Sequence, residues 1–224
     1  MKATLIDSMG SDLSVVNAAR VSFGKQSEWK YECCEDDSLP YLDEKDAKLI
    51  HYLAKHNHKS PFGHCFASFH VKAPIFVARQ LVKHKFLRWN EISRRYVDEE
   101  PEFYVPDVWR GRAKDKKQGS GSTIESGAGS ISYEVGLLGE DFLDMYKWLL
   151  EERGVCPEQA RMILPQSTYT EWYWSGSLDA FADMCNLRCK EDTQWETRQI
   201  ANQIDEEMGK LYPVAWEALR AYGD

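Results

Sequence analysis

The alternation of residues 65–73 constrains the fold of this chain more than any other stretch of its sequence. Apolar side chains occupy every second position, namely Cys65, Ala67, Phe69, Val71 and Ala73. A period of two predicts a β-strand with one buried face. Proline follows at position 74, where it suits the first turn of a helix. A helix is therefore predicted over residues 75–84, with four apolar side chains facing inward: Ile75, Ala78, Leu81 and Val82.

Apolar side chains at helical spacing predict helices in much of the remaining chain. These helices begin at about residue 12 and cover residues 43–56, 135–149, 177–185, 195–211 and 213–219, with a short helical turn from Pro157 to Arg161. Short strands are predicted near Leu5 and over residues 92–97. Strands and helices in separate regions indicate the α+β class. We expect one domain, residues 1–224, with a central antiparallel sheet flanked by helices.

Two polar stretches are predicted to be loops. Glycine and serine dominate residues 119–132, and a charged stretch precedes them. Such a composition is typical of a flexible connection. A flexible loop is therefore expected at about residues 111–132. Residues 24–42 are polar and acidic and predict a second loop.

Positive charge is concentrated in one segment of an acidic chain. Residues 79–95 contain six Lys or Arg and a single acid, Glu91, whereas the formal net charge of the chain is −8. On a helix, Arg79 and Lys83 share one face, and so do Gln80 and His84. Stacked cations repel one another unless an anion lies between them. The segment favours a local anion site over a nucleic-acid surface, where basic charge covers a face of the domain. A solvated basic patch is the alternative.

Several classes of protein are not expected from this sequence. It contains no apolar stretch long enough to cross a membrane, and Asp7 and Asp12 lie where a signal peptide needs an apolar core. The six cysteines follow no disulfide framework. These features predict a cytoplasmic protein with reduced thiols and no membrane partner.

Common motifs for metals, nucleotides and nucleophiles are missing. The six histidines show no H-x-x-x-H or H-E-x-x-H spacing, and the cysteines show no C-x-x-C, so no metal site is predicted. Neither glycine-rich nucleotide loop is present, and G-x-S-x-G is absent as well. A bound nucleotide would therefore be held by side-chain cations.

Residues 83–96 carry a resemblance to a known family. Their sequence is KHKFLRWNEISRRY, which resembles the R-H-R-x-x-S-x-N-E-x-S-x-R-Y signature of the flavin-dependent thymidylate synthases. Five further blocks follow the order of that family: AARVSF at 18–23, HKSPFGH at 58–64, VKAPIFVARQ at 71–80, ARMILP at 160–165 and NLR at 186–188. The resemblance therefore covers most of the chain.

The resemblance implies a methyltransferase that converts dUMP to dTMP. It implies FAD as the cofactor, with methylenetetrahydrofolate as carbon donor and NADPH as reductant. It also implies a homotetramer whose active sites are shared between chains, with no nucleic-acid partner. In this family reduced flavin supplies a hydride and no enzyme cysteine attacks the pyrimidine, which agrees with a sequence that lacks a cysteine nucleophile.

The resemblance assigns roles to individual residues. Arg188 is similar to the catalytic arginine that polarises the uracil ring, a role that suits a cation that stays protonated. The expected dUMP-binding residues are Gln80, Lys83, Glu91, Ser93, Arg94, Arg95, Arg161 and Arg188. The expected FAD-binding residues are Ser22, His58, Ser60, Lys83, His84, Lys85 and Glu91.

This sequence departs from the family pattern at several of these positions. Lysines at positions 83 and 85 replace two arginines of the signature. The positive charge is kept, but the planar guanidinium that binds phosphate through two hydrogen bonds is lost. These changes predict weaker or differently oriented FAD binding. Arg88 replaces the first serine of the signature. Family flavin contacts fall on Ser177, Asp179 and Asp183, and these contacts are not carried over.

Two alternatives to a thymidylate synthase remain at this point. Changes at the edge of the pocket are compatible with a related enzyme that acts on another deoxypyrimidine monophosphate. The basic segment is also compatible with a non-catalytic protein that binds nucleotides or nucleic acid, although the acidic remainder argues against nucleic acid. Salt-dependent DNA binding by a colourless, flavin-free protein would favour this second alternative.

Overall fold

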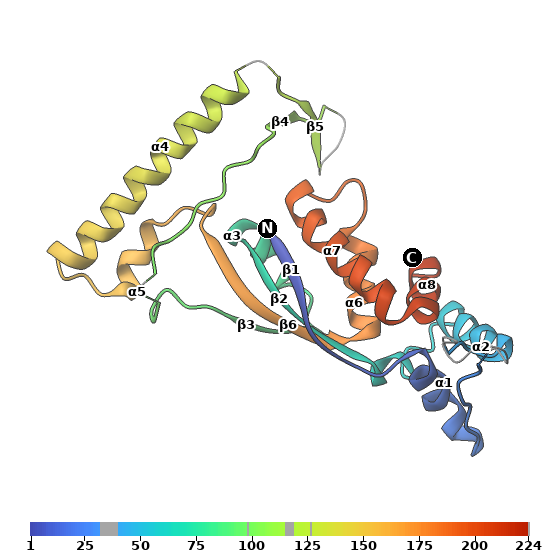
Figure 1. Ribbon diagram of the computed structural model, residues 1–224. Helices are drawn as coiled ribbons and strands as arrows, with labels where there is room; N and C mark the ends of the chain where they lie inside the picture. Colours follow the sequence, from blue (N-terminus) through green and yellow to red (C-terminus); the bar gives the residue numbers. More distant parts are fainter. Residues whose placement is uncertain (32–39, 98, 115–118, 126, 224) are drawn as a thin grey trace.

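A four-stranded antiparallel sheet forms the centre of the computed structural model, which describes residues 1–31, 40–97, 99–114, 119–125 and 127–223 (Figure 1). The strand order is β1 (Lys2–Met9), β2 (Phe66–Pro74), β6 (Tyr169–Ser177) and β3 (Arg88–Glu91). Every neighbouring pair in this sheet is antiparallel. Helices flank the sheet, which confirms the predicted α+β class.

Strands β2 and β6 supply the core of the sheet. Phe69 lies opposite Trp174, and Val71 lies opposite Trp172. All four side chains are buried, so the alternation predicted for residues 65–73 is confirmed. Complete burial of side chains of this size contributes about 1.5–3 kcal/mol each. The sequence analysis missed β6, because aromatic side chains lie on both of its faces and obscure the period of two.

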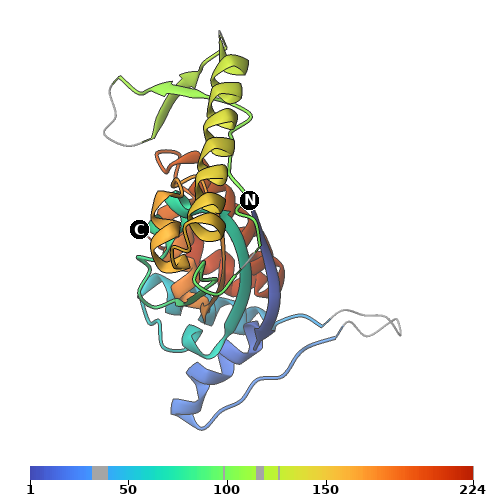
Figure 2. The same ribbon diagram turned by 90° about the vertical axis from the view of Figure 1, so that its left-hand side faces the viewer.

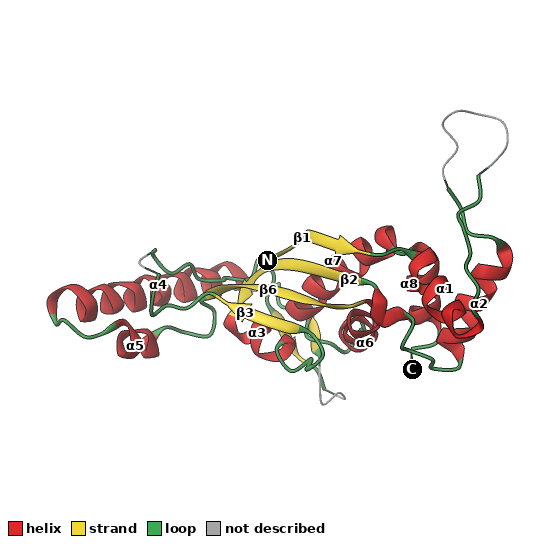
Figure 3. Cartoon of the chain, turned by 90° about the horizontal axis from the view of Figure 1, so that it is seen from below, coloured by secondary structure: helices red, strands yellow, loops and turns green. Residues whose placement is uncertain are grey.

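Helices cover the buried face and one end of the sheet. Helices α3 (Ile75–Leu81), α6 (Leu178–Arg188) and α7 (Trp195–Leu211) contact the strands. Figure 3 shows α1 (Asp12–Arg20), α2 (Glu44–Lys55) and α8 (Pro213–Ala221) grouped at one end of the molecule. The helices predicted to begin at about residue 12 and over residues 43–56, 177–185, 195–211 and 213–219 are confirmed.

The segment after β2 differs from the prediction in two respects. Helix α3 ends at Leu81 rather than near residue 84, so Val82 is 47% exposed and does not face inward. The strand predicted over residues 92–97 is wrong. Strand β3 lies four residues earlier, because its backbone pairs with β6, and a turn follows in which Tyr96 N donates to Ser93 O.

The opposite end of the molecule contains a long helix and a small hairpin. Helix α4 (Ala128–Lys147) projects beyond the sheet in two perpendicular views (Figures 1 and 2). Strands β4 (Arg110–Arg112) and β5 (Ser120–Thr123) pair with each other. The loop predicted at about 111–132 therefore includes regular structure, since β5 pairs with β4 and α4 begins seven residues earlier than predicted. Residues 115–118 and 126 lie outside the described residues, and the flexibility of the loop stays a prediction.

Short helical turns complete the chain. Turn η1 (Val21–Phe23) follows α1, and η2 (Phe62–His64) precedes β2. After α4 come η3 (Trp148–Glu152), α5 (Pro157–Ala160) and η4 (Arg161–Ile163). The last two confirm the helical turn predicted from Pro157 to Arg161.

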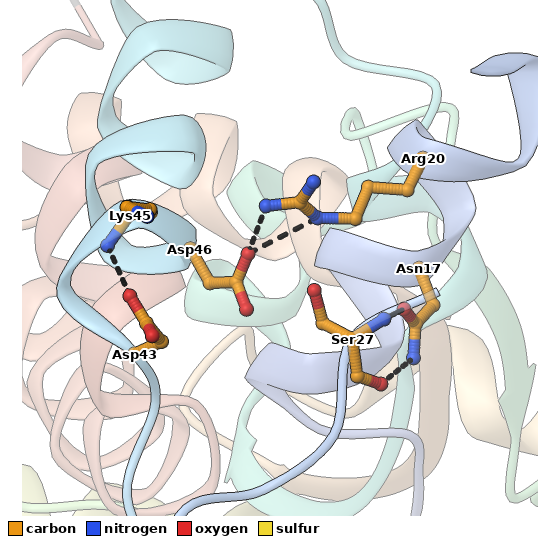
Figure 4. Close-up of polar contacts among 6 residues, drawn as sticks. All are labelled: Asn17, Arg20, Ser27, Asp43, Lys45 and Asp46. Carbon is orange, nitrogen blue, oxygen red and sulfur yellow. Dashed lines mark hydrogen bonds and ion pairs between the residues drawn. The ribbon is translucent and has the colours of Figure 1, made fainter. Parts of the chain in front are cut away.

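Polar contacts fix α1 against α2 and hold the segment that follows α1 (Figure 4). Arg20 pairs with Asp46, whose side chain is buried. Asn17 exchanges two hydrogen bonds with the backbone of Ser27, at 2.7 and 3.1 Å. Because Arg20 supplies both an opposite charge and hydrogen bonds, the buried carboxylate of Asp46 is satisfied.

Cys65, Cys156, Cys185 and Cys189 are free thiols, whereas Cys33 and Cys34 lie outside the described residues. Across the described part of the chain, the helices lack the length and apolar character that crossing a bilayer requires.

Candidate active site

The first part of the basic segment forms a turn that lies against β6. His84 N donates to Leu81 O and Leu87 N donates to His84 O, each at 3.1 Å. Glycine at position 176 permits this approach, because a Cβ there would overlap the side chain of Leu87. The turn lines a cavity of about 300 Å³ together with Ala180 and Asp183 of α6. The predicted FAD-binding residues in the lining are Lys83, His84 and Lys85.

A larger cavity of about 560 Å³ shares Asp183 with the first. Its lining includes His58, Lys59 and Lys190. Lys59 Nζ contacts both carboxylate oxygens of Asp183, at 2.6 and 2.7 Å. The ion pair is exposed and contributes little to stability, but it neutralises the one carboxylate that the two cavities share.

Arg188 lies in the last turn of α6, where the helix dipole favours a cation. Its Nε donates to Nε2 of His84 at 3.1 Å, and its Nη2 donates to Gln80 O at 3.2 Å. No carboxylate pairs with this guanidinium within the described residues, and three of its five N–H groups have no acceptor there. Partial burial lowers the pKa of Arg188. A partly buried cation without a counter-ion is suited to an anionic ligand.

His84 is held in its neutral form. Burial, together with the neighbouring Arg188 charge, lowers the pKa of His84 to about 4. At neutral pH the ring therefore carries one proton and can accept a hydrogen bond from Arg188. The ring also lies 6.4 Å from that of Trp174, in an edge-to-face arrangement.

A second group of predicted site residues lies beyond the other end of β3. Ser93 Oγ accepts hydrogen bonds from N and Nε of Arg95, at 3.4 and 3.3 Å. The Arg95 guanidinium pairs with Glu158 Oε1 at 3.4 Å. Arg161 follows Glu158 by three residues, which is about one helical turn. Ser93, Arg95 and Arg161 therefore lie in one region.

The remaining predicted residues are placed as follows. Glu91, at the end of β3, accepts hydrogen bonds from Trp89 Nε1 at 3.0 Å and Thr170 Oγ1 at 2.6 Å. Arg94 donates to the carbonyl of Glu99. Ser60 is exposed and follows Lys59 at the rim of the larger cavity, whereas Ser22 is exposed in η1, beyond α1.

One chain thus brings part of its predicted site residues together in two clusters. The first, which we call the Arg188 cluster, contains Gln80, Lys83, His84, Lys85 and Arg188. The second, which we call the Arg95 cluster, contains Ser93, Arg95 and Arg161. Strand β3 lies between Lys85 and Ser93 along the chain, and among the described residues no hydrogen bond or ion pair joins the two clusters. Ser22 lies apart from both.

The sequence profile of Thy1, the thymidylate synthase complementing protein family, matches residues 4–214. The chain belongs to this family. A flavin-dependent thymidylate synthase of Thermus thermophilus is 40% identical over 219 residues, which cover 97% of this chain and 75% of that protein. A flavin-dependent thymidylate synthase of Thermosipho africanus is 38% identical, with 96% of this chain and 88% of that protein covered.

Solved structures agree with the placement in the Thy1 family. A UMP/dUMP methylase, PolB from Streptomyces cacaoi, bound with 5-Br UMP, has a TM-score of 0.84 and 31% identity, covering 99% of this chain and 94% of that chain. The structure of the same protein bound with 5-Br dUMP has a TM-score of 0.83 and 33% identity, covering 99% of this chain and 95% of that chain.

The contacts of this Thy1 chain include a network that the sequence analysis did not anticipate. The side chain of Gln80 donates to Gln194, which in turn donates to Glu196 at 3.1 Å. Glu196 is buried and pairs with Arg110 at 3.1 Å, and the Arg110 guanidinium lies over the ring of Trp195. The network ties α3 to the start of α7 and to the β4–β5 hairpin. Gln80 and Gln194 are 114 residues apart in the sequence and Arg110 and Glu196 are 86 apart, so no local pattern could reveal the network.

One group in the Thy1 chain has the composition of a metal site. Within the described ranges, ligand atoms of Cys185, Cys189 and Asp205 lie within 4.8 Å of one another. Asp205 Oδ1 already accepts hydrogen bonds from Trp216 Nε1 and Arg220 Nε, at 3.0 and 2.8 Å. Because the Arg220 charge opposes a cation there, we do not assign a metal to this group, and the expectation of no metal site stays a prediction.

Proposed function

We propose that this protein is a flavin-dependent thymidylate synthase that converts dUMP to dTMP. The observation that carries the proposal is Arg188, a partly buried cation with no carboxylate partner among the described residues. Neutral His84 holds it beside the turn at residues 82–87, which we call the basic turn. A uracil ring that gains negative charge during methylation is the kind of ligand this guanidinium would stabilise.

The two adjoining cavities fit a flavin dinucleotide. Lys83 and Lys85 line the smaller cavity, and Lys190 lines the larger one. Lys59 neutralises Asp183, the acid that lines both cavities. These ammonium groups would hold the pyrophosphate of FAD in the absence of a glycine-rich loop. When bound, the flavin supplies hydride chemistry, and the chain binds, orients and polarises.

The Arg95 cluster is proposed to bind the 5′-phosphate of dUMP. Arg95 and Arg161 supply two guanidinium groups, and Ser93 supplies a hydroxyl donor. Arginine binds phosphate bidentately, so two arginines and a serine fix its position as well as its charge. Glu158, which pairs with Arg95 at 3.4 Å, would release it to the phosphate.

Because no hydrogen bond or ion pair joins the two clusters within the described residues, we infer that each active site is completed by a second chain in a homotetramer. Large apolar side chains beside both clusters are exposed, including Phe86 at 85% and Met162 at 79%. Helix α4 also leaves an apolar stripe uncovered, with Leu138, Phe142 and Met145 all exposed. Exposed apolar surface of this extent is typical of a protein interface.

Methylenetetrahydrofolate as carbon donor and NADPH as reductant complete the proposed reaction. The test is release of tritium from 5-tritiated dUMP, with dTMP identified by chromatography. Tritium release and dTMP are both expected only when flavin, methylenetetrahydrofolate and NADPH are all present. Product formed without added or bound flavin would contradict the proposal.

A ribonucleotide substrate is the second candidate. The Streptomyces cacaoi relative is described as a UMP/dUMP methylase, and its solved structures hold 5-Br UMP and 5-Br dUMP. The same assay with tritiated UMP distinguishes the candidates. Equal kcat/KM for UMP and dUMP would assign this chain to the broader activity.

Replacing Lys83 and Lys85 by arginine is expected to tighten FAD binding by about 3- to 10-fold, because guanidinium forks grip phosphate in two places. Fluorescence titration of FAD into the double variant measures the effect. Lys48→Arg, on the exposed face of α2, is the matched control and should leave the affinity unchanged. Equal affinities of the double variant and the natural protein would refute this expectation.

A further inference from the structure

We propose that His84 is the positioning residue of Arg188, and that it acts as a neutral hydrogen-bond acceptor rather than as a ligand of the flavin. This inference rests on the proposed function, because it assigns the group that orients the guanidinium toward the uracil ring. The basic turn and α6 are far apart in the sequence, so the contact exists only in the folded chain.

The contact fixes the tautomer of His84. The Nε–H of Arg188 points at Nε2 of the imidazole, at 3.1 Å. Since arginine has donors only, Nε2 must offer a lone pair, and the ring proton therefore lies on Nδ1. The second anchor of Arg188 is Gln80 O, a backbone carbonyl at 3.2 Å. Two anchors on different atoms fix both the position and the plane of the guanidinium.

The backbone around His84 is itself well anchored. Its N–H and its carbonyl both take part in turn hydrogen bonds, to Leu81 O and from Leu87 N. Leu87 is buried, and Trp174 packs edge-on against the imidazole. The imidazole is thus placed by an anchored backbone and by its contact with Trp174, as expected of a residue that orients another side chain.

Protonation would break the contact. The charged groups around the imidazole are Arg188 and Asp183 on α6, together with Lys83 and Lys85 in its own turn. Asp183 is paired with Lys59, so the surroundings are mainly positive. A protonated His84 could not accept from Arg188 and would repel it. Because burial and Arg188 lower its pKa to about 4, the contact persists at neutral pH and is lost as the pH falls through that value.

Replacement of His84 by leucine and by glutamine tests the proposal. Leucine removes the acceptor, and misplacement of the guanidinium should lower kcat at saturating dUMP by about 10- to 100-fold. Glutamine keeps a carbonyl oxygen at the reach of Nε2 and should be at least about tenfold more active than the leucine variant. FAD affinity should be the same for both variants and the natural protein. His56→Leu, at the end of α2, controls for loss of a histidine.

Selective ¹⁵N NMR of histidine gives a readout that does not depend on turnover. His84 should show protonated Nδ1, unprotonated Nε2 and a titration midpoint near 4. Equal losses of kcat in both variants, or weaker FAD binding with normal kcat when flavin is saturating, would overturn the proposal. If the natural protein makes no dTMP, the proposed function fails, whereas an Nε2-protonated His84 contradicts the positioning role alone.

Discussion

Arg188→Ala is expected to lower kcat for dTMP formation by about 100- to 1000-fold, the usual cost of removing one electrostatic contact to the transition state. In the folded chain this guanidinium donates to His84 and to Gln80 O and pairs with no carboxylate among the described residues. Its remaining donors are therefore available to the uracil ring. Flavin should stay bound, because Arg188 contacts neither lysine of the basic turn. Steady-state kinetics and the flavin absorbance of the purified variant measure the two effects.

Two further variants make this result specific. Arg188→Lys keeps the charge but loses the Nε donor and the planar fork, so an intermediate activity is expected. Arg198→Ala removes a partly exposed arginine of α7 that donates to Glu191 O, and it should leave kcat unchanged. Turnover of Arg188→Ala within threefold of the natural protein would show that the uracil ring is polarised by another group.

The double variant Leu138→Glu, Met145→Glu is expected to dissociate the proposed tetramer and to lower activity by more than about tenfold at assay concentrations. Both positions lie on the uncovered stripe of α4, where Leu138 is 54% and Met145 49% exposed in one chain. A partner that covers the stripe would bury two unpaired carboxylates, which is strongly unfavourable. Sedimentation velocity measures the assembly.

The control lies on the same helix. Tyr133 is exposed on nearly the opposite side of α4, so Tyr133→Glu is a comparable exchange of a large side chain for a carboxylate outside the stripe. It should leave the sedimentation coefficient unchanged. If the double variant remains tetrameric, α4 does not lie in the interface and the assembly must use another surface.

The fold was predictable where one face of an element is apolar and the other polar. The alternation of β2 and the stripes of α2, α7 and α8 are of this kind, because burial on one side selects the sequence. Strand β6 carries Trp172 and Trp174 inward and Tyr173 between them outward, so three consecutive aromatic residues obscure the alternation of its faces. Strand β3 is a polar edge strand whose position is set by pairing with β6, a partner that local sequence does not reveal.

The family was predictable from the sequence, whereas the geometry of the candidate site was not. The family resemblance identified the chain correctly, and the anion site indicated by the charge of residues 79–95 stays a prediction. The sequence did not reveal that β3 lies between the Arg188 cluster and the Arg95 cluster along the chain, because the position of β3 is set by pairing with the distant strand β6. The Lys59–Asp183 pair was also missed, since 124 residues separate its partners.

Mixed oligomers of Arg188→Ala and Arg161→Ala test most directly whether the two clusters combine across chains. Each variant alone should retain at most about 1% of the natural rate. In a 1:1 mixture assembled by co-expression with two different tags, about one quarter of the sites should contain both natural arginines, if these come from different chains of a symmetric oligomer. We expect dTMP formation at about that fraction of the natural rate. Doubly tagged oligomers that form no dTMP would contradict the shared site.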